Sequence, residues 1–220
     1  MKNKSLVIAG ALVLGVFVAG TVAVVWRVAS LASAPAPVAA PAPMTAGKLK
    51  LGDPFPKDLV VRDEAGKEIN LASYIDGQHY VVYTFHHPDC PCAANCGALI
   101  GEMGKAGYTD VKVVGIMVEG MDDPRVMTAL KKQHEDKVIT FPVHFDAGKT
   151  VMNRLGATRT PEIWLVDKEG IVRFWGAPEN TLFPGSPGHR YFLREAVDAL
   201  RAGKTPEVAA TPPIGCIIGS

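Results

Sequence analysis

Two largely apolar runs restrict the fold more than any other part of this sequence. They are YVVYTF at 80–85, which is β-branched and aromatic throughout, and VKVVGIMV at 111–118. Such runs are typical of strands that are buried on both faces of a parallel sheet. Between them, apolar residues follow helical spacing over residues 93–105. A strand, a helix and a second strand in this order form a β-α-β unit, which predicts an α/β domain.

The segments around this unit predict further strands and helices. Asp123 followed by Pro124 indicates a helix start. The short turn at 167–170 requires the strands 163–166 and 171–175 to run antiparallel. The other expected elements are a strand pair around the turn at 63–66, a strand within 141–146, a short helix closed by Gly156, and an amphipathic helix within 190–203. Together they predict a mixed β-sheet with helices on both faces.

The first 27 residues predict a membrane anchor. Residues 6–26 carry no charge, and as a helix they reach roughly 30 Å, which is enough to span a bilayer. Cleavage after the ASA at 32–34 is disfavoured because Pro35 follows it, and a cleaved signal has a shorter apolar core. Lys2 and Lys4 favour a cytoplasmic N-terminus. We therefore expect a single-pass protein of the inner (cytoplasmic) membrane, with its domain facing the periplasm or the cell exterior.

The remaining chain divides into three parts. Residues 28–47 form an alanine- and proline-rich linker, residues 48–204 the globular domain, and residues 205–220 an apolar, proline-containing tail. The formal net charge is +1, from 23 basic and 22 acidic residues. Such a balance creates no field that attracts nucleic acid, so we expect no nucleic-acid partner.

Three of the four cysteines lie in the segment FHHPDCPCAANC at 85–96. Pro91 suits the first position of a helix, which makes Cys90 the expected N-cap. A helix N-terminus stabilises a thiolate, the form that attacks disulfides. Cys90 is therefore the expected nucleophile, open to solvent. His86 and His87 would strengthen this effect if protonated, and are otherwise ordinary solvated side chains.

Three cysteines are candidate partners of Cys90. A Cys90–Cys92 disulfide closes a small, easily reduced ring, and we expect Cys92 to release the mixed disulfide. Cys96 lies one helical turn after Cys92 and is either a partner or a small buried hydrophobe. Cys216 is a resolving cysteine, a link to another protein, or a bystander near the chain end.

Four motifs resemble the thioredoxin fold, in its redoxin branch of TlpA-like and AhpC/TSA-like proteins. They are GDPFP at 52–56, GKEINL at 66–71, the cysteine loop after a buried strand, and RTPEIWLVDKEG at 159–170. The resemblance covers residues 50–203, and the HPDCPC within the cysteine loop is similar to that of membrane-tethered bacterial redoxins. It implies a thioredoxin-like mixed sheet and a thiol–disulfide oxidoreductase.

The resemblance also implies roles for particular residues. Pro161 would be a cis proline that faces Cys90, and Thr160 would present its backbone to a bound substrate chain. The position where thioredoxins carry their second cysteine is Ala93 here. Glu162 either shuttles protons at the thiol site or is a surface charge.

Two other functions stay open. CAANC at 92–96 is similar to the cysteine pair of Sco-type copper proteins, so Cys92, Cys96 and His86 would bind copper. The distant histidine of that family is missing near Pro161. The second alternative is a peroxiredoxin-like thiol peroxidase, although the residue three positions before Cys90 is histidine rather than threonine or serine.

The expected function is that of a membrane-anchored, extracytoplasmic thiol–disulfide oxidoreductase without a cofactor. Cys90 attacks a disulfide of a partner protein and forms a mixed disulfide with it. The expected partners are proteins with thiols or disulfides, and a membrane electron donor or acceptor, because outward-facing compartments are oxidising. The direction of electron transfer is open.

Overall fold

The computed structural model describes residues 49–105, 107–118, 120–181, 183 and 185–218. The expected membrane anchor and the whole of the expected linker lie outside these residues and stay predictions. No helix in the described part of the chain combines the length and the apolarity that a membrane crossing needs.

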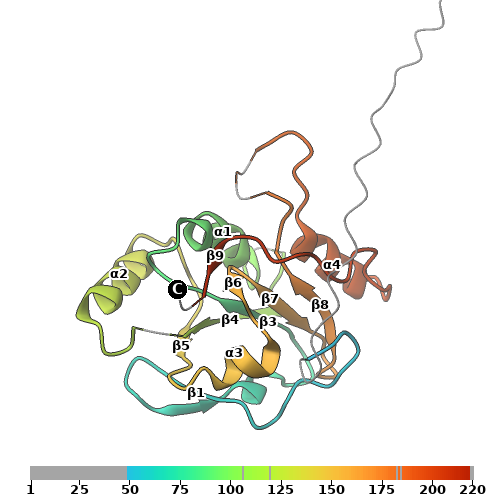
Figure 1. The fold of residues 1–220 in the computed structure, drawn as a ribbon. Helices are drawn as coiled ribbons and strands as arrows, with labels where there is room; N and C mark the ends of the chain where they lie inside the picture. Colours follow the sequence, from blue (N-terminus) through green and yellow to red (C-terminus); the bar gives the residue numbers. More distant parts are fainter. Residues whose placement is uncertain (1–48, 106, 119, 182, 184, 219–220) are drawn as a thin grey trace, which may run out of the picture. The chain divides into compact units, whose positions relative to one another are not determined.

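A mixed β-sheet forms the centre of the described domain, with the strand order β2-β1-β5-β4-β3-β7-β8 (Figure 1). Its strands are β1 (Val60–Arg62), β2 (Glu68–Asn70), β3 (Tyr80–Phe85), β4 (Val111–Met117), β5 (Val143–Phe145), β7 (Ile163–Val166) and β8 (Val172–Gly176). The strands β3, β4 and β5 run parallel to one another, and the remaining pairs are antiparallel. The predicted β-α-β unit and the antiparallel pair β7–β8 are thus confirmed.

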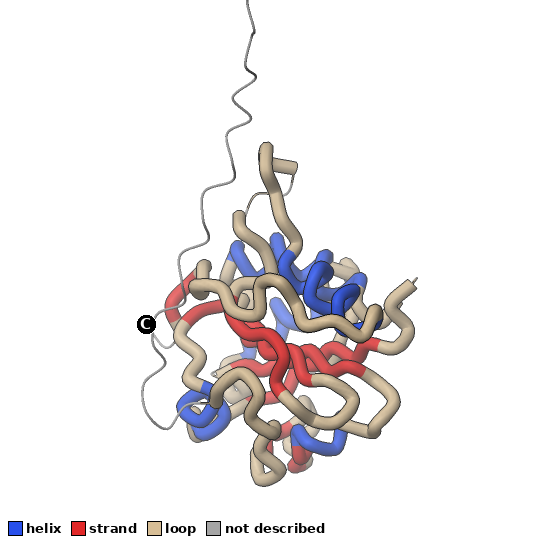
Figure 2. The backbone as a smooth tube through the Cα atoms, turned by 90° about the vertical axis from the view of Figure 1, so that its right-hand side faces the viewer, coloured by secondary structure: helices blue, strands red, loops and turns tan. Residues whose placement is uncertain are grey.

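Helices lie on both sides of the sheet (Figure 2). They are α1 (Pro91–Glu102), α2 (Pro124–Glu135), α3 (Thr150–Leu155), α4 (Phe192–Arg201) and the 3-10 helix η1 (Leu71–Tyr74). The helices α1, α2 and α4 share a buried cluster with Val82, whereas α3 and η1 share a second cluster with Val81. Because neighbouring residues of a strand point to opposite faces, these two clusters lie on opposite sides of the sheet.

Two helices begin at the predicted capping residues. Cys90 is the N-cap of α1, and Pro91 is its first residue. Asp123 caps α2 by accepting a hydrogen bond from the Arg125 N–H at 2.9 Å. Proline suits the first helical position because the N–H that it lacks would have no acceptor within the helix.

The C-terminal tail packs against the domain and ends in a short strand. This strand, β9 (Cys216–Ile217), pairs antiparallel with β6 (Arg159–Thr160), apart from the main sheet. Upstream, Thr211 is buried, and its hydroxyl donates to the Ala177 carbonyl at 2.9 Å. Figure 1 shows the tail, in dark red, passing from α4 to β6. The pairing of β9 with β6 was not predicted from the sequence.

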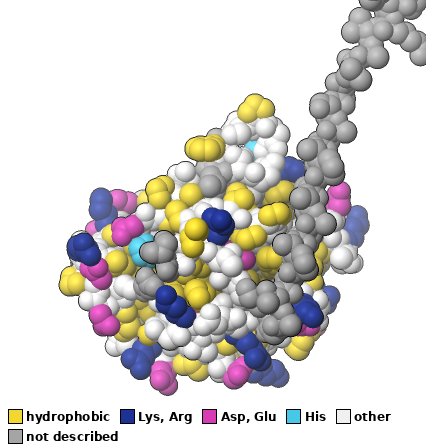
Figure 3. Space-filling model, viewed as in Figure 1, with side chains coloured by type: hydrophobic (Ala, Val, Ile, Leu, Met, Phe, Trp, Pro, Cys, Tyr) yellow, Lys and Arg dark blue, Asp and Glu magenta, His cyan; other side chains and the backbone are white. Residues whose placement is uncertain are grey.

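Basic and acidic side chains are intermixed around the margin of the face drawn in Figure 3. Hydrophobic side chains lie between them across the same face. This intermixing is in keeping with the near balance of 23 basic and 22 acidic residues.

Candidate thiol active site

Cys90 lies at the junction between β3 and α1. As the N-cap of α1, it stands at the end of the helix where free N–H groups and the helix dipole favour a negative charge. Its side chain makes no capping hydrogen bond, and its Sγ lies 3.4 Å from the carbonyl oxygen of Thr160. The site therefore joins the start of α1 to the strand β6.

The loop that carries β6 has the geometry that the resemblance implied. The peptide bond between Thr160 and Pro161 is cis. Glu162, the next residue, is only 1% exposed and is therefore not a surface charge. Its carboxylate accepts hydrogen bonds from the N–H and hydroxyl of Thr158, at 2.8 and 3.2 Å, and from the N–H of Arg159, at 3.2 Å. The buried carboxylate thus holds this loop in position opposite Cys90.

Cys90 forms a disulfide with Cys216, and not with Cys92 as the sequence analysis expected. The Cα atoms of Cys90 and Cys216 lie 6.2 Å apart, within the usual range for disulfides. Positions i and i+2 at a helix start do not face each other, whereas β9 places Cys216 opposite Thr160. Cys92 is a half-buried free thiol. The sulfur atoms of these three cysteines nevertheless lie within 4.8 Å of one another.

The disulfide is covered by the tail. Cys90 is only 4% exposed, which corrects the expectation of a sulfur open to solvent. A cleft of about 190 Å³ remains beside the disulfide. It is lined by the polar residues His86, His87, Asp89 and Thr160, by both bonded cysteines, and by the apolar residues Phe85, Val118, Ile217 and Ile218. Access of a large substrate to Cys90 therefore depends on the position of the tail.

Residues 51–175 match the AhpC/TSA family over more than half of the chain. The chain belongs to the AhpC/TSA family. It is thus a redoxin of the thioredoxin-like superfamily, as the four motifs predicted. The family placement supports thiol–disulfide oxidoreductase activity, and this chemistry generally needs no cofactor. No curated protein matches the sequence.

Two of the solved structures that resemble this chain share its fold. A hypothetical protein from Sinorhizobium meliloti 1021 has a TM-score of 0.65 at 26% identity, covering 78% of this chain and 94% of that chain. An uncharacterized conserved protein from Geobacillus kaustophilus has a TM-score of 0.65 at 21% identity, covering 77% and 92%. A putative thiol:disulfide interchange protein DsbE from Chlorobium tepidum has a TM-score of 0.49 at 21% identity, covering 58% and 85%.

The two histidines shortly before Cys90 of this AhpC/TSA protein differ in their environment. His86 is buried, and its Nε2 lies 2.8 Å from Gln133 Oε1. Burial lowers the pKa of His86 to about 4, so this side chain is neutral near pH 7 and adds no positive charge beside Cys90. His87 is half-buried, lines the cleft, and accepts a hydrogen bond from the Asp89 N–H at 3.2 Å.

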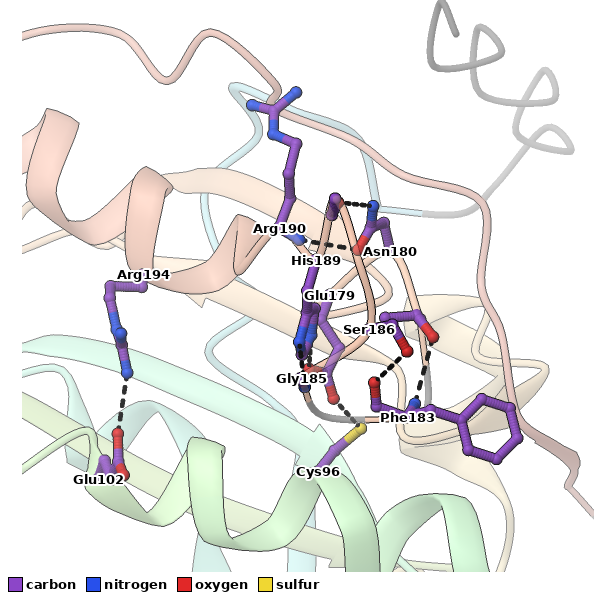
Figure 4. Close-up of polar contacts among 12 residues, drawn as sticks. Cys96, Glu102, Glu179, Asn180, Phe183, Gly185, Ser186, His189, Arg190 and Arg194 are labelled. Carbon is purple, nitrogen blue, oxygen red and sulfur yellow. Dashed lines mark hydrogen bonds and ion pairs between the residues drawn. The ribbon is translucent and has the colours of Figure 1, made fainter. Parts of the chain in front are cut away.

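Cys96 of the redoxin is fully buried and belongs to a different polar group. Its thiol donates to Glu179 Oε1 at 2.6 Å, and Glu179 Oε2 lies 2.5 Å from His189 Nε2 (Figure 4). Burial, together with the hydrogen bond to Glu179, raises the pKa of the Cys96 thiol well above its usual range. A thiol held in its protonated form is a poor nucleophile. Cys96 is therefore buried, as one of the two predictions for this residue stated. Its thiol is hydrogen-bonded to a carboxylate, however, and does not act only as a small hydrophobic side chain.

The copper alternative needs Cys92, Cys96 and His86 to lie together. In the structure the Cys96 sulfur contacts Glu179, and His86 is hydrogen-bonded to Gln133. Within the described residues, the metal-type cluster consists instead of the sulfurs of Cys90, Cys92 and Cys216. The three residues expected to bind copper are thus not brought together in this AhpC/TSA protein.

Proposed function

We propose that this redoxin is a membrane-anchored thiol–disulfide oxidoreductase whose redox couple is Cys90 and Cys216. The observation that carries the proposal is the disulfide between an N-cap cysteine and a strand beside the cis proline. The helix N-terminus favours the thiolate of Cys90, both as attacking and as leaving group. Cys216 takes the resolving role for which the sequence analysis favoured Cys92.

In the reducing direction the reaction has two exchange steps. The Cys90 thiolate attacks one sulfur of a substrate disulfide, the substrate S–S bond breaks, and the other substrate sulfur leaves as a thiolate. The Cys216 thiolate then attacks Cys90 Sγ in the mixed disulfide. The second substrate thiolate leaves, and the Cys90–Cys216 disulfide forms. Two electrons pass from the protein to its substrate, and a dithiol reductant restores the two thiols by the same steps.

The anchor and the membrane partner belong to the same proposal. The uncharged run at 6–26 is long enough to hold the domain at a membrane. An outward-facing domain in an oxidising compartment needs a membrane electron donor to work as a reductase, or an acceptor to work as an oxidase. Alkaline phosphatase fused after Ser220 should be active, because this reporter folds only outside the cytoplasm. Activity of a cytoplasmic reporter alone at this position would reverse the orientation.

The chemistry is tested on the full-length protein in detergent, with a protein disulfide as substrate and a dithiol as reductant. Cys90→Ser should lower the rate about a hundredfold or more, because the hydroxyl of serine does not exchange with disulfides. The matched control is Cys96→Ser on the same helix, which should keep the rate within about twofold. A Cys90→Ser protein with full activity contradicts the proposal.

A peroxidase function is the second candidate, favoured by the AhpC/TSA match and by the cleft beside Cys90. In that case peroxide oxidises the Cys90 thiolate to a sulfenic acid, and Cys216 condenses with it, releasing water. Hydrogen peroxide in place of the protein disulfide, with the same two variants, distinguishes the two functions. Faster turnover with peroxide than with any protein disulfide would favour the peroxidase.

A further inference from the structure

The end of the tail lies on β6 as an added strand beside Cys90. Cys216 pairs with Thr160, and Ile217 pairs with Arg159. The Ile218 N–H donates to the Thr158 carbonyl at 3.0 Å. These contacts are made by the backbone of the tail, so another extended chain could make them as well.

A further contact fixes the residue before Cys216. The Arg159 guanidinium donates to the Gly215 carbonyl oxygen at 2.8 Å. This bond again uses the backbone of the tail and not its side chains. It sets how far the chain can shift along β6, and so places a sulfur at the position of Cys216 Sγ.

The site along β6 that the tail occupies is termed the β6 groove. Within this groove, Gly215 is the tail position at which the type of residue is most restricted. Its φ is +118°, a conformation that side chains with a Cβ rarely adopt. A Cβ added there would lie 2.1 Å from the Thr160 carbonyl oxygen and 3.3 Å from Pro161 Cδ. The Thr160 oxygen belongs to the backbone that Glu162 holds in place, so it cannot move aside as a flexible side chain would. Only glycine fits immediately before the cysteine in this register.

The residues after the cysteine are selected differently. Ile217 is 61% exposed, so the first position after the cysteine makes little demand on its side chain. Ile218 packs against the buried cluster on the α3 side of the sheet. An apolar residue is therefore favoured at the second position after the cysteine.

We propose that the β6 groove beside Cys90 binds partner proteins through an extended segment in which glycine precedes a redox-active cysteine and an apolar residue follows two positions later. Residues 215–218 are an internal copy of this segment, and tail and partner compete for the groove. The proposal rests on the proposed function. A partner cysteine in the place of Cys216 forms its mixed disulfide with Cys90, and the tail displaces it in the second exchange step.

The selectivity is tested with peptides and the full-length Cys92→Ser, Cys216→Ser variant in detergent, in which Cys90 is the exchanging thiol. Each peptide carries its cysteine as a mixed disulfide with 2-thiopyridine. Attack by Cys90 forms the protein–peptide disulfide and releases the pyridinethione, which is followed by absorbance. The reference peptide has the sequence PIGCIIGS from the tail. Replacement of its glycine by alanine should slow the reaction about tenfold or more, because the clash costs as much as overpacking a core.

Replacement of the isoleucine directly after the cysteine by serine should change the rate by less than about twofold, because that side chain is exposed. Equal rates for the glycine and alanine peptides would overturn the selectivity. Bis(2-hydroxyethyl) disulfide, which has no peptide backbone to pair with β6, separates this failure from that of the proposed function. If neither the peptides nor this small disulfide react, Cys90 is not an exchanging thiol and both proposals fail.

A second measurement uses the tail itself in the otherwise unchanged full-length protein. Gly215→Ala should shift the equilibrium of the Cys90–Cys216 disulfide toward the dithiol about tenfold in a glutathione buffer, because the clash opposes docking of the tail. The matched control is Gly203→Ala, since Gly203 also has a positive φ, of +68°, but no atom within 4 Å of an added Cβ. Equal shifts in the two variants would show that the groove does not select glycine.

Discussion

Two cysteines on the same helix, Cys90 and Cys96, have opposite surroundings. Cys90 is the N-cap of α1, beside a cleft, and is bonded to a cysteine of the tail. Cys96 lies further along α1, fully buried, and donates a hydrogen bond to the carboxylate of Glu179. The helix end favours the thiolate, whereas burial beside Glu179 disfavours it. Reactivity in this protein is therefore decided by where a sulfur stands on the helix and by what faces it.

The Cys96 group connects two distant parts of the chain. Glu179 and His189 come from the loop between β8 and α4, and Figure 4 shows them directed at α1. Their side chains are 1% and 5% exposed. Burying such a pair is costly unless its hydrogen bonds are satisfied, and the Cys96 thiol supplies one of them. We interpret this group as a structural link that holds the loop on the helix whose first turn carries Cys90.

The largest expected effect is on alkylation of the reduced protein. Cys90 should react with iodoacetamide about a thousandfold faster than Cys96 at pH 7, because a buried thiol with a raised pKa has almost no thiolate. Mass spectrometry of digests after timed quenching measures both rates in one sample. Comparable rates would remove the contrast between the two cysteines.

Removal of His189 from the buried pair with Glu179 tests whether the Cys96 group stabilises the fold. His189→Ala should lower the free energy of unfolding by about 3 kcal/mol, because it leaves Glu179 buried without its main partner. The matched control is His79→Ala, which removes a hydrogen bond with Asp76 near the surface and should have a small effect. Denaturant unfolding measures both. Exchange activity of the folded His189→Ala protein should persist, and its loss would give this group a part in the chemistry.

The third prediction concerns His86, which is close to Cys90 in sequence but shares the buried character of Cys96. Its pKa in the folded protein is about 4, below the ordinary value near 6.5. The unfolded chain therefore binds a proton more readily as the pH falls below 6.5, and stability is lost between pH 6.5 and about 4. By pH 5 the loss should reach about 2 kcal/mol.

His86→Gln carries an amide in place of the imidazole. In this variant the free energy of unfolding should depend less on pH between pH 6.5 and about 4. The pH dependence of disulfide exchange between pH 6 and 8 should stay unchanged, because His86 is already neutral there. Unfolding curves and exchange rates across this pH range provide the two measurements. A shifted pH–rate profile would mean that His86 acts on the Cys90 thiol.

Local patterns were enough to predict most of the fold. The strands β3 and β4 and the starts of α1 and α2 were found where expected. The largely apolar runs and the prolines that predict them act through neighbouring residues. The N-cap position of Cys90 was found as well. These features depend on short sequence segments, which is why the sequence reveals them. The cis bond before Pro161 was also found, but it was implied by the family resemblance and not by the local sequence.

The missed features depend on contacts between distant segments. Cys216 reaches Cys90 across 126 positions of sequence, by way of a strand too short to leave a pattern. Glu179 and His189 lie among proline, glycine and polar residues, which resemble an exposed loop. Because the pairing of β9 with β6 was not predicted, Cys90 was expected to be open to solvent, whereas it is only 4% exposed. Neither periodicity nor spacing carries information about such long-range pairings.

The smallest effect is expected for Glu162→Gln, next to the cis proline. The glutamine carbonyl oxygen can still accept hydrogen bonds from Thr158 and Arg159, so β6 should keep its place and the exchange rate should fall by less than about threefold. If Glu162 instead transfers protons in the wild type, the variant should have an altered pH–rate profile, because glutamine does not titrate. Exchange rates from pH 5 to 9 for the wild type and the variant decide between the two roles. Parallel profiles assign Glu162 to positioning of the strand that tail and substrate share, whereas the loss of one limb in the variant assigns it to proton transfer.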